Sequence, residues 1–426
     1  MTARILLRGG CVLTLGKGTP NLRRGDVLIE GDRIAQVGQD LRARDADVVD
    51  AAGAIVMPGF VDTHRHVWTS LFRNLDHAAA DDATGRTAAE RYDADAVYAA
   101  TLIGLLGAVE AGITTVVDWS DLDPDEDRGE AALQAHAESG LRTVFVLARG
   151  ATRETLARLA RSAGPSTTIA LGARLGHPGA QPPVEPWTLA RELGLRMHLH
   201  GASPPGAIAA LAARGFLGED ATLVHGGDLE EADLDALAAS GAGVSLAPAS
   251  EMAGGAAPPI QRLIDRGVRP GLGVDEERVA PGDLFAQMRA AISWQHAVVF
   301  ERKLAGKGGL PRLLTTRDVI RWATVDGARA VGLGGVTGAL EPGMRADVVL
   351  LRGDRPNVFP INDPIGAVVW GMDTSNVDTV LVGGRALLEG GHLRADGARA
   401  RDLARAAAAA LAGAPGFRDA ALEGTG

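Results

Sequence analysis

The sequence predicts an α/β fold, in which a (β/α)₈ TIM barrel is joined to a small composite β-sandwich domain built from both chain ends. In the middle of the chain, short apolar runs alternate with amphipathic helical segments, which is typical of a parallel sheet wound with helices. Both ends instead contain short β-type runs separated by glycine turns. The composition agrees, because 426 residues with 46% hydrophobic content can bury a large core.

The β-rich runs lie at the two ends of the chain. The junction Glu30-Gly31-Asp32-Arg33 has the chemistry of a tight hairpin, and similar β-type runs return at 346–351 and 377–385. The sequence therefore predicts three units. They are a small β domain from residues 1–57 and 345–395, a barrel at 58–344, and a C-terminal helical tail at 396–426.

Eight strands are expected in the middle segment, counted from Phe60. They are residues 60–66, 113–118, 143–147, 168–172, 196–200, 222–225, 243–246 and 271–275. Helical patterns separate or follow them, at 92–111, 129–139, 152–162, 186–193, 205–213, 230–239, 259–265, 281–299, 316–323 and 325–331. This count is that of a (β/α)₈ barrel, whose active site lies where the strands end.

Polar residues end four of these strands. His64 and His66 follow the Pro58-Gly59 break in an apolar run and, being two apart on a strand, emerge on the same side. Further groups of this kind are His198 and His200 after the fifth strand, His225 after the sixth and Asp275 after the eighth. Each alone is compatible with a capping or packing role, but together they would converge on one mouth. Imidazole is the commonest nitrogen ligand of Zn, Fe and Ni, so the pattern indicates a metal site.

Charge and composition exclude other classes of protein. A formal charge of −10 argues against nucleic acid as a partner, and a single cysteine, Cys11, excludes an internal disulfide and thiolate metal clusters. The only lysines are Lys17, Lys303 and Lys307, so no lysine is available inside the barrel to bridge two metals. One metal ion is therefore expected. Without a signal or membrane-spanning pattern, we expect no membrane partner and a cytoplasmic location.

The segment from Pro58 to His66, the strand-end histidines His198 and His225, and Gly271-Leu272-Gly273-Val274-Asp275 resemble the signature of the amidohydrolase superfamily. Specifically, they resemble its mononuclear branch of cytosine, guanine and adenosylhomocysteine deaminases and triazine hydrolases. The resemblance implies that His64, His66, His198 and Asp275 bind one divalent metal, with zinc expected and iron or manganese as alternatives. It also implies that His225 and Asp275 are catalytic groups beside the metal-bound water, and that the enzyme forms a homodimer or homotetramer.

The chain departs from this family pattern at two positions. Three residues after the fifth-strand histidine, where the deaminases usually have a proton-shuttling glutamate, Gly201 has no side chain. His200 is then either a substitute acid or an alternative metal ligand. After the seventh strand, Glu251 stands in place of a Ser-Asn element and is a candidate replacement carboxylate, although a solvated loop glutamate explains it equally well.

Three residues are candidates for substrate binding. His177 ends the fourth strand, where related enzymes present a substrate-contacting histidine. Trp68 and Arg73 follow the first strand and are candidates for a pocket wall and an anion contact, although a plain salt bridge also suits Arg73.

These observations favour a metal-dependent hydrolase of a non-peptide C–N bond in a small molecule. The reaction is either deamination of an amidine-like heterocycle or opening of a cyclic amide or related ring. Two alternatives remain. One is a non-hydrolytic metalloenzyme, such as a decarboxylase or hydratase, and the other is a binding protein that has lost turnover.

Overall fold

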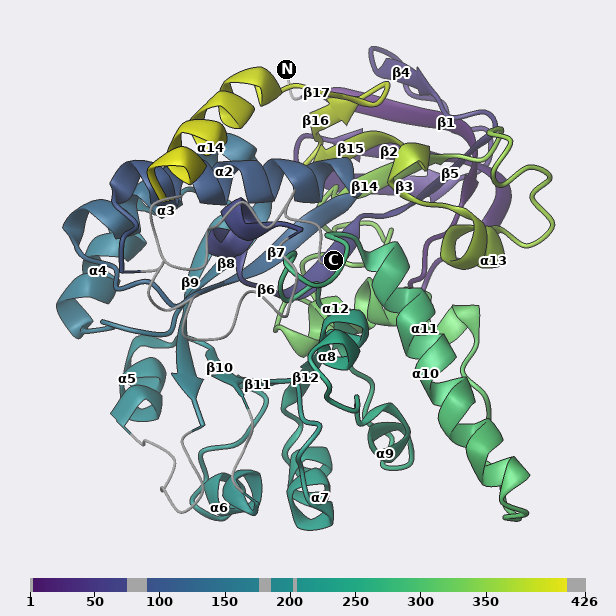
Figure 1. Ribbon diagram of the computed structural model, residues 1–426. Helices are drawn as coiled ribbons and strands as arrows, with labels where there is room; N and C mark the ends of the chain where they lie inside the picture. Colours follow the sequence, from purple (N-terminus) through teal and green to yellow (C-terminus); the bar gives the residue numbers. More distant parts are fainter. Residues whose placement is uncertain (1–2, 75–89, 176–184, 202–204, 412–426) are drawn as a thin grey trace, which may run out of the picture.

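A computed structural model describes residues 3–74, 90–175, 185–201 and 205–411. Its centre is an eight-stranded sheet in which every neighbouring pair of strands is parallel (Figure 1). In order, the strands are β6 (Phe60–Arg65), β7 (Ile113–Ser120), β8 (Arg142–Leu147), β9 (Thr167–Arg174), β10 (Met197–His200), β11 (Ala221–Val224), β12 (Gly243–Leu246) and β13 (Gly271–Leu272). An isolated parallel bridge between Arg65 of β6 and Asp275, three residues after β13, nearly closes the sheet as a barrel.

Helices connect the strands and cover the barrel. They are α2 (Ala94–Glu110), α3 (Glu126–Ser139), α4 (Arg153–Ser162), α5 (Glu185–Leu193), α6 (Ala207–Ala213), α7 (Glu231–Ser240), α8 (Pro248–Ala253), α9 (Ile260–Ile264), α10 (Leu284–Leu304), α11 (Thr316–Trp322) and α12 (Val325–Ala330). Aspartates begin three of them, because the carboxylates of Asp93, Asp125 and Asp283 accept hydrogen bonds from otherwise unpaired helical N–H groups. A short 3₁₀ helix, η1 (Val67–Phe72), follows β6 directly.

Strands from both chain ends form a second, mixed sheet of nine strands. Along the sheet the order is β17 (His392–Leu393), β16 (Arg385–Glu389), β15 (Val377–Val382), β14 (Val348–Arg352), β5 (Ala54–Pro58), β1 (Arg4–Val12), β2 (Leu22–Glu30) and β3 (Arg33–Gly38), with β4 (Asp47–Asp50) paired to β1. The predicted α/β class, with a barrel and a separate β unit from the two ends, is confirmed. The domain boundaries remain a prediction.

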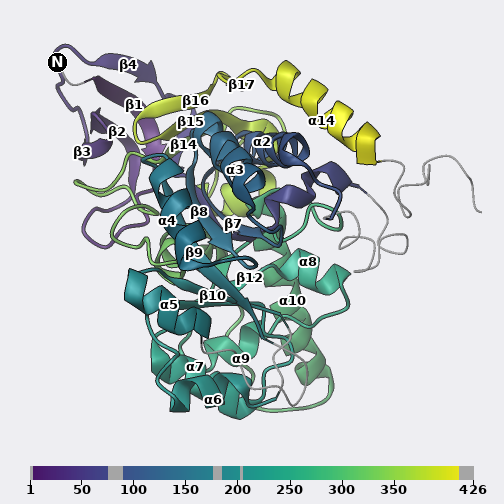
Figure 2. The same ribbon diagram turned by 90° about the vertical axis from the view of Figure 1, so that its left-hand side faces the viewer.

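The rest of the C-terminal region lies outside the barrel. Two short helical segments, α13 (Pro364–Gly366) and the π-helix η3 (Ala367–Gly371), follow β14, and the 3₁₀ turn η4 (Thr374–Asn376) precedes β15. Helix α14 (Gly397–Leu411) lies along α2, on the same side as the composite sheet (Figures 1 and 2). Among the described residues, no helix is long and apolar enough to cross a membrane.

Close packing between β6 and the end of the barrel fixes the position of the strand that carries the first histidines. A Cβ atom on Gly273 would lie 2.7 Å from the backbone oxygen of His64 and 2.8 Å from its nitrogen. Deeper in the barrel than His64, apolar side chains such as Val61, Val117 and Val146 fill the interior. The polar groups are therefore left at the carboxyl ends of the strands.

Candidate metal centre

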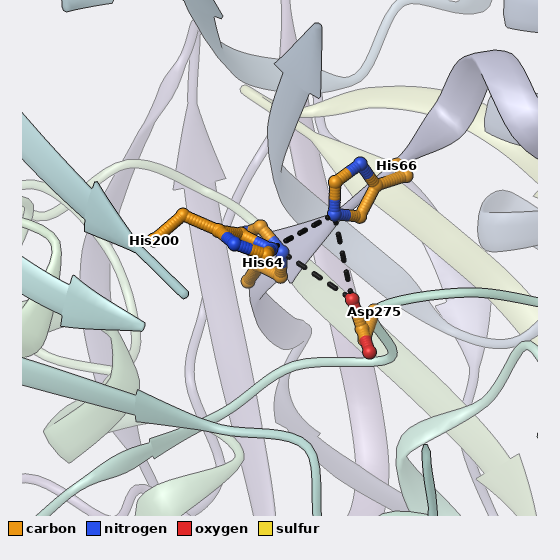
Figure 3. Close-up of side chains that lie close together, drawn as sticks. All are labelled: His64, His66, His200 and Asp275. Carbon is orange, nitrogen blue, oxygen red and sulfur yellow. Dashed lines mark hydrogen bonds and ion pairs between the residues drawn. The ribbon is translucent and has the colours of Figure 1, made fainter. Parts of the chain in front are cut away.

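Four side chains converge at the carboxyl ends of the barrel strands. His64 lies on β6 and His66 directly follows it, His200 ends β10, and Asp275 lies three residues after β13. Figure 3 shows these side chains turned towards one another. One ligand atom from each lies within 4.8 Å of all the others. The group is therefore suited to a single metal ion.

Distances within this group suit a shared cation. Nε2 of His66 lies 3.1 Å from Nε2 of His200, and Oδ1 of Asp275 lies 3.4 Å from Nε2 of His64 and 3.5 Å from Nε2 of His66. Among the described residues, Nδ1 of His64 has no hydrogen-bond partner. Three buried imidazoles and one carboxylate form a nitrogen and oxygen donor set that Zn, Fe and Mn accept.

The structure places His200, and not His198, in the convergent group. His198 was expected to bind the metal in preference to His200, but the convergent group contains His200 and not His198. Both side chains point into the barrel, yet a strand rises about 3.3 Å per residue, so His198 lies one layer deeper. Its side chain is fully buried, and neither ring nitrogen has a hydrogen-bond partner among the described residues.

If His200 is the metal ligand, the position at which a proton-shuttling glutamate is expected also moves. Counted three residues from His200, that position is Ser203 instead of Gly201. Ser203 lies outside the described residues. Neither residue carries a carboxylate, so the departure from the deaminase pattern remains.

A second histidine and glutamate lie beside the group. Nδ1 of His225 is 2.9 Å from Oε1 of Glu251, and its Nε2 is 3.8 Å from Oδ1 of Asp275. The same Glu251 oxygen accepts the backbone N–H of Ala247, whereas Oε2 is buried without a hydrogen-bond partner among the described residues. Ser250 donates to Oδ2 of Asp275 at 2.6 Å. Glu251 is thus a buried partner of the catalytic candidate His225, not a solvated loop glutamate.

Backbone strain accompanies this arrangement. His225 and Asp275 both have positive φ angles, 67° and 66°, which residues other than glycine seldom adopt. Such strain persists only where the surrounding structure enforces it, and it is frequent at functional sites. Here one of the two strained residues, Asp275, belongs to the group of four, and the other, His225, lies beside it.

Burial and charge divide the histidines into two kinds. Burial lowers the pKa of His64 to about 3, with the neighbouring His66 and His225 adding to the effect, and it holds the pKa of His200 well below 6.5. Burial also opposes the charged form of His225, but the carboxylates of Asp275 and Glu251 outweigh it and raise the pKa to about 9. Burial therefore favours the neutral, metal-binding form of His64 and His200, whereas the two carboxylates favour the protonated form of His225.

Comparison with known proteins places the chain in a family. The Amidohydrolase family matches residues 55–387. The chain belongs to the amidohydrolase family. It is 31% identical to a 5'-deoxyadenosine deaminase of Methanothermobacter thermautotrophicus, over 96% of this chain and 99% of that one. As the sequence predicted, the protein is a metal-dependent hydrolase that acts on carbon–nitrogen bonds other than peptide bonds.

Solved structures agree with the fold of this amidohydrolase. A triazine hydrolase variant superposes with a TM-score of 0.82 at 21% identity, covering 95% of this chain and 99% of that one. An adenosine deaminase from Xanthomonas campestris with bound zinc gives a TM-score of 0.79 at 20% identity, covering 96% and 98%. At such low identities these likenesses concern the fold alone.

The amidohydrolase site contains an aspartate that the sequence analysis missed. Oδ2 of Asp121, just after β7, lies 3.0 Å from Nδ1 of His66. Its Oδ1 accepts from Nε1 of Trp119 at 3.0 Å and from Nη2 of Arg174 at 2.7 Å. Burial alone would raise the pKa of Asp121, but the hydrogen bond from His66 and the charge of Arg174 hold it far below its usual range. Its position directly after the second strand was the available signal.

The three candidates for substrate binding have different outcomes. Trp68 is part of η1, and its buried ring packs edge-on against Tyr92 and Phe72. Arg73 makes two hydrogen bonds of 2.9 Å to the carboxylate of Glu277, which is the salt bridge considered from the sequence. His177 lies outside the described residues. Substrate contacts by these residues stay predictions.

Proposed function

We propose that the protein is a mononuclear, zinc-dependent hydrolase that deaminates an amidine-like heterocycle or opens a cyclic amide or related ring. The proposed metal ligands are His64, His66, His200 and Asp275. The observation that carries the proposal is their convergence within 4.8 Å at the mouth of the barrel. Zinc is the preferred ion because a structural neighbour, the adenosine deaminase, contains it.

The residues around the group suit hydrolysis. A divalent metal held there supplies Lewis acidity, which lowers the pKa of water towards neutrality and polarises the substrate. Oδ1 of Asp275 faces the same point as the imidazoles, so this carboxylate is placed to accept the proton of the attacking water. Nε2 of His225 faces the same oxygen and can donate a hydrogen bond to negative charge developing on the substrate.

Glu251 is proposed to replace the glutamate that the deaminases carry after the fifth strand. It is the buried carboxylate that is hydrogen-bonded to Nδ1 of His225, and its second oxygen has no hydrogen-bond partner among the described residues. A proton can therefore pass between Glu251 and Nδ1 of His225 while Nε2 serves the reacting groups. Such proton transfer contributes about 10²- to 10⁴-fold to a rate.

Activity on defined compounds tests the proposal. The metal-loaded protein is assayed with and without chelator on 5'-deoxyadenosine, adenosine, aminotriazines, cyclic ureas and lactams, with ammonia and ring-opened product measured separately. We expect chelator-sensitive release of ammonia or a ring-opened product. If the protein holds one metal and hydrolyses none of these compounds, the proposed substrate class is wrong.

The role of Glu251 has its own test. E251Q is expected to lower kcat by about 10²-fold or more while metal content and KM stay close to wild type. The matched control is E231Q, the same change on the exposed face of α7, which should leave kcat unchanged. Equal kcat values for E251Q and wild type would remove Glu251 from the proposal.

We also propose, from the family resemblance, that the enzyme is a homodimer or homotetramer and works in the cytoplasm. Light scattering after size-exclusion chromatography and cell fractionation would test these two points.

A further inference from the structure

The imidazole of His66 has polar neighbours at both of its ring nitrogens. Its Nε2 faces His200 and Asp275, whereas Nδ1, on the opposite side of the ring, faces Oδ2 of Asp121 at 3.0 Å. A carboxylate at this distance favours a proton on Nδ1 of the ring. It therefore selects the tautomer in which the lone pair of Nε2 points at the ion position.

Asp121 is itself held in place by donors. Oδ1 accepts from Nε1 of Trp119 at 3.0 Å and from Nη2 of Arg174 at 2.7 Å, while Oδ2 is left for His66. Both oxygens of the carboxylate therefore face N–H groups. The indole of Trp119 is fully buried, so this support is part of the packed barrel.

Arg174 links this support to a second histidine. Its Nη1 lies 3.3 Å from Nδ1 of His200, while its Nη2 and Nε contact Asp121. One short network thus lies behind both His66 and His200. On the other side of the site, Glu251 faces Nδ1 of His225 in the same manner.

We propose that Asp121 is a positioning residue, which orients His66 and fixes its tautomer so that Nε2 binds the metal. The inference rests on the metal ligation proposed above and adds a residue that does not touch the ion. When a carboxylate accepts a hydrogen bond from a metal-binding imidazole, replacing that carboxylate typically weakens metal binding by about 10- to 100-fold.

The substitution D121N separates this role from simple space filling. Asparagine has nearly the same shape, but it replaces one acceptor oxygen with an amide NH₂ group. Because His66, Trp119 and Arg174 all present N–H groups, the amide must face at least one donor with another donor. Either the tautomer of His66 is then no longer fixed, or the side chain at position 121 loses a hydrogen bond from Trp119 or Arg174.

Zinc affinity, measured by competition with a chromophoric chelator, is the primary readout. D121N is expected to raise the Kd for zinc by about 10- to 100-fold. D123N is the matched control, because Asp123 is exposed on the same loop, and its Kd should equal that of wild type. The visible spectrum of the cobalt(II) form should change in D121N and not in D123N, which a purely structural role would not produce.

The outcomes separate the two proposals. If wild type fails to bind one equivalent of metal, the proposed ligation is wrong. If wild type binds one equivalent and D121N binds it equally well with an unchanged cobalt spectrum, the positioning role of Asp121 is wrong.

A crystal structure of zinc-loaded wild type provides a test that needs no variant. We expect His66 to coordinate through Nε2 with Nδ1 within hydrogen-bond distance of Asp121. Coordination through Nδ1, or an Asp121 carboxylate turned away from the ring, would overturn the inference even if D121N does not fold.

Discussion

Replacing His200 and His198 separately tests which of the two histidines holds the metal. H200A removes one of the four convergent side chains. Structural zinc sites bind with about 10–16 kcal/mol shared among four ligands, so each ligand contributes roughly 2.5–4 kcal/mol. Since 1.4 kcal/mol is tenfold, H200A is expected to weaken zinc binding by about 10²- to 10³-fold.

H198L is expected to leave the metal in place. His198 is buried, and its ring nitrogens lack hydrogen-bond partners among the described residues, so an apolar side chain of similar volume breaks no hydrogen bond of the ring. The free energy of unfolding of the metal-free protein should change by less than about 1.5 kcal/mol.

Equilibrium dialysis against a competing chelator, followed by elemental analysis, measures zinc retention in both variants. Urea unfolding of the metal-free forms shows whether each variant is folded. If H198L loses zinc while H200A retains it, the reasoning from the depth of the two side chains in the barrel is refuted.

Three further predictions concern the metal and its supports. Chelation should abolish turnover and lower the unfolding temperature, and added zinc should restore both, because saturation at about 1,000 times Kd stabilises a protein by about 4 kcal/mol. R65M should cost about 3–5 kcal/mol in urea unfolding, since Arg65 is fully buried between two carboxylates, whereas R153M at an exposed pair should cost less than about 1 kcal/mol. G273A should lower zinc affinity, because its methyl group would press on the backbone of His64; unchanged affinity would contradict the close packing described for β6.

Much of the fold could be predicted because its signals are local. Buried parallel strands appear in the sequence as short apolar runs, and those at 113–118 and 143–147 fall within β7 and β8. Helix ends were less accurate, since they depend on capping. The helix expected at 129–139 begins at Glu126 because Asp125 caps it.

The site could be predicted only in part because its geometry is not local. Strand periodicity shows that His198 and His200 share a face, but it does not give their depth in the barrel. From the sequence, Glu251 was a candidate replacement for the deaminase glutamate, but its contact with His225 could not be predicted, and Asp121 was missed. Their roles depend on imidazoles from other strands, so only the packed barrel shows which partners they meet.

The composite sheet has a consequence for biosynthesis. Strand β5, which leads directly into the histidine-bearing strand, is flanked by β1 on one side and by β14 on the other. The nascent chain therefore cannot complete this sheet until β14 has left the ribosome, long after β5 has been made. Pairing across so long an interval is a slow step in self-assembly. During translation, the exposed edge of β5 is consequently a point at which chaperone protection would matter.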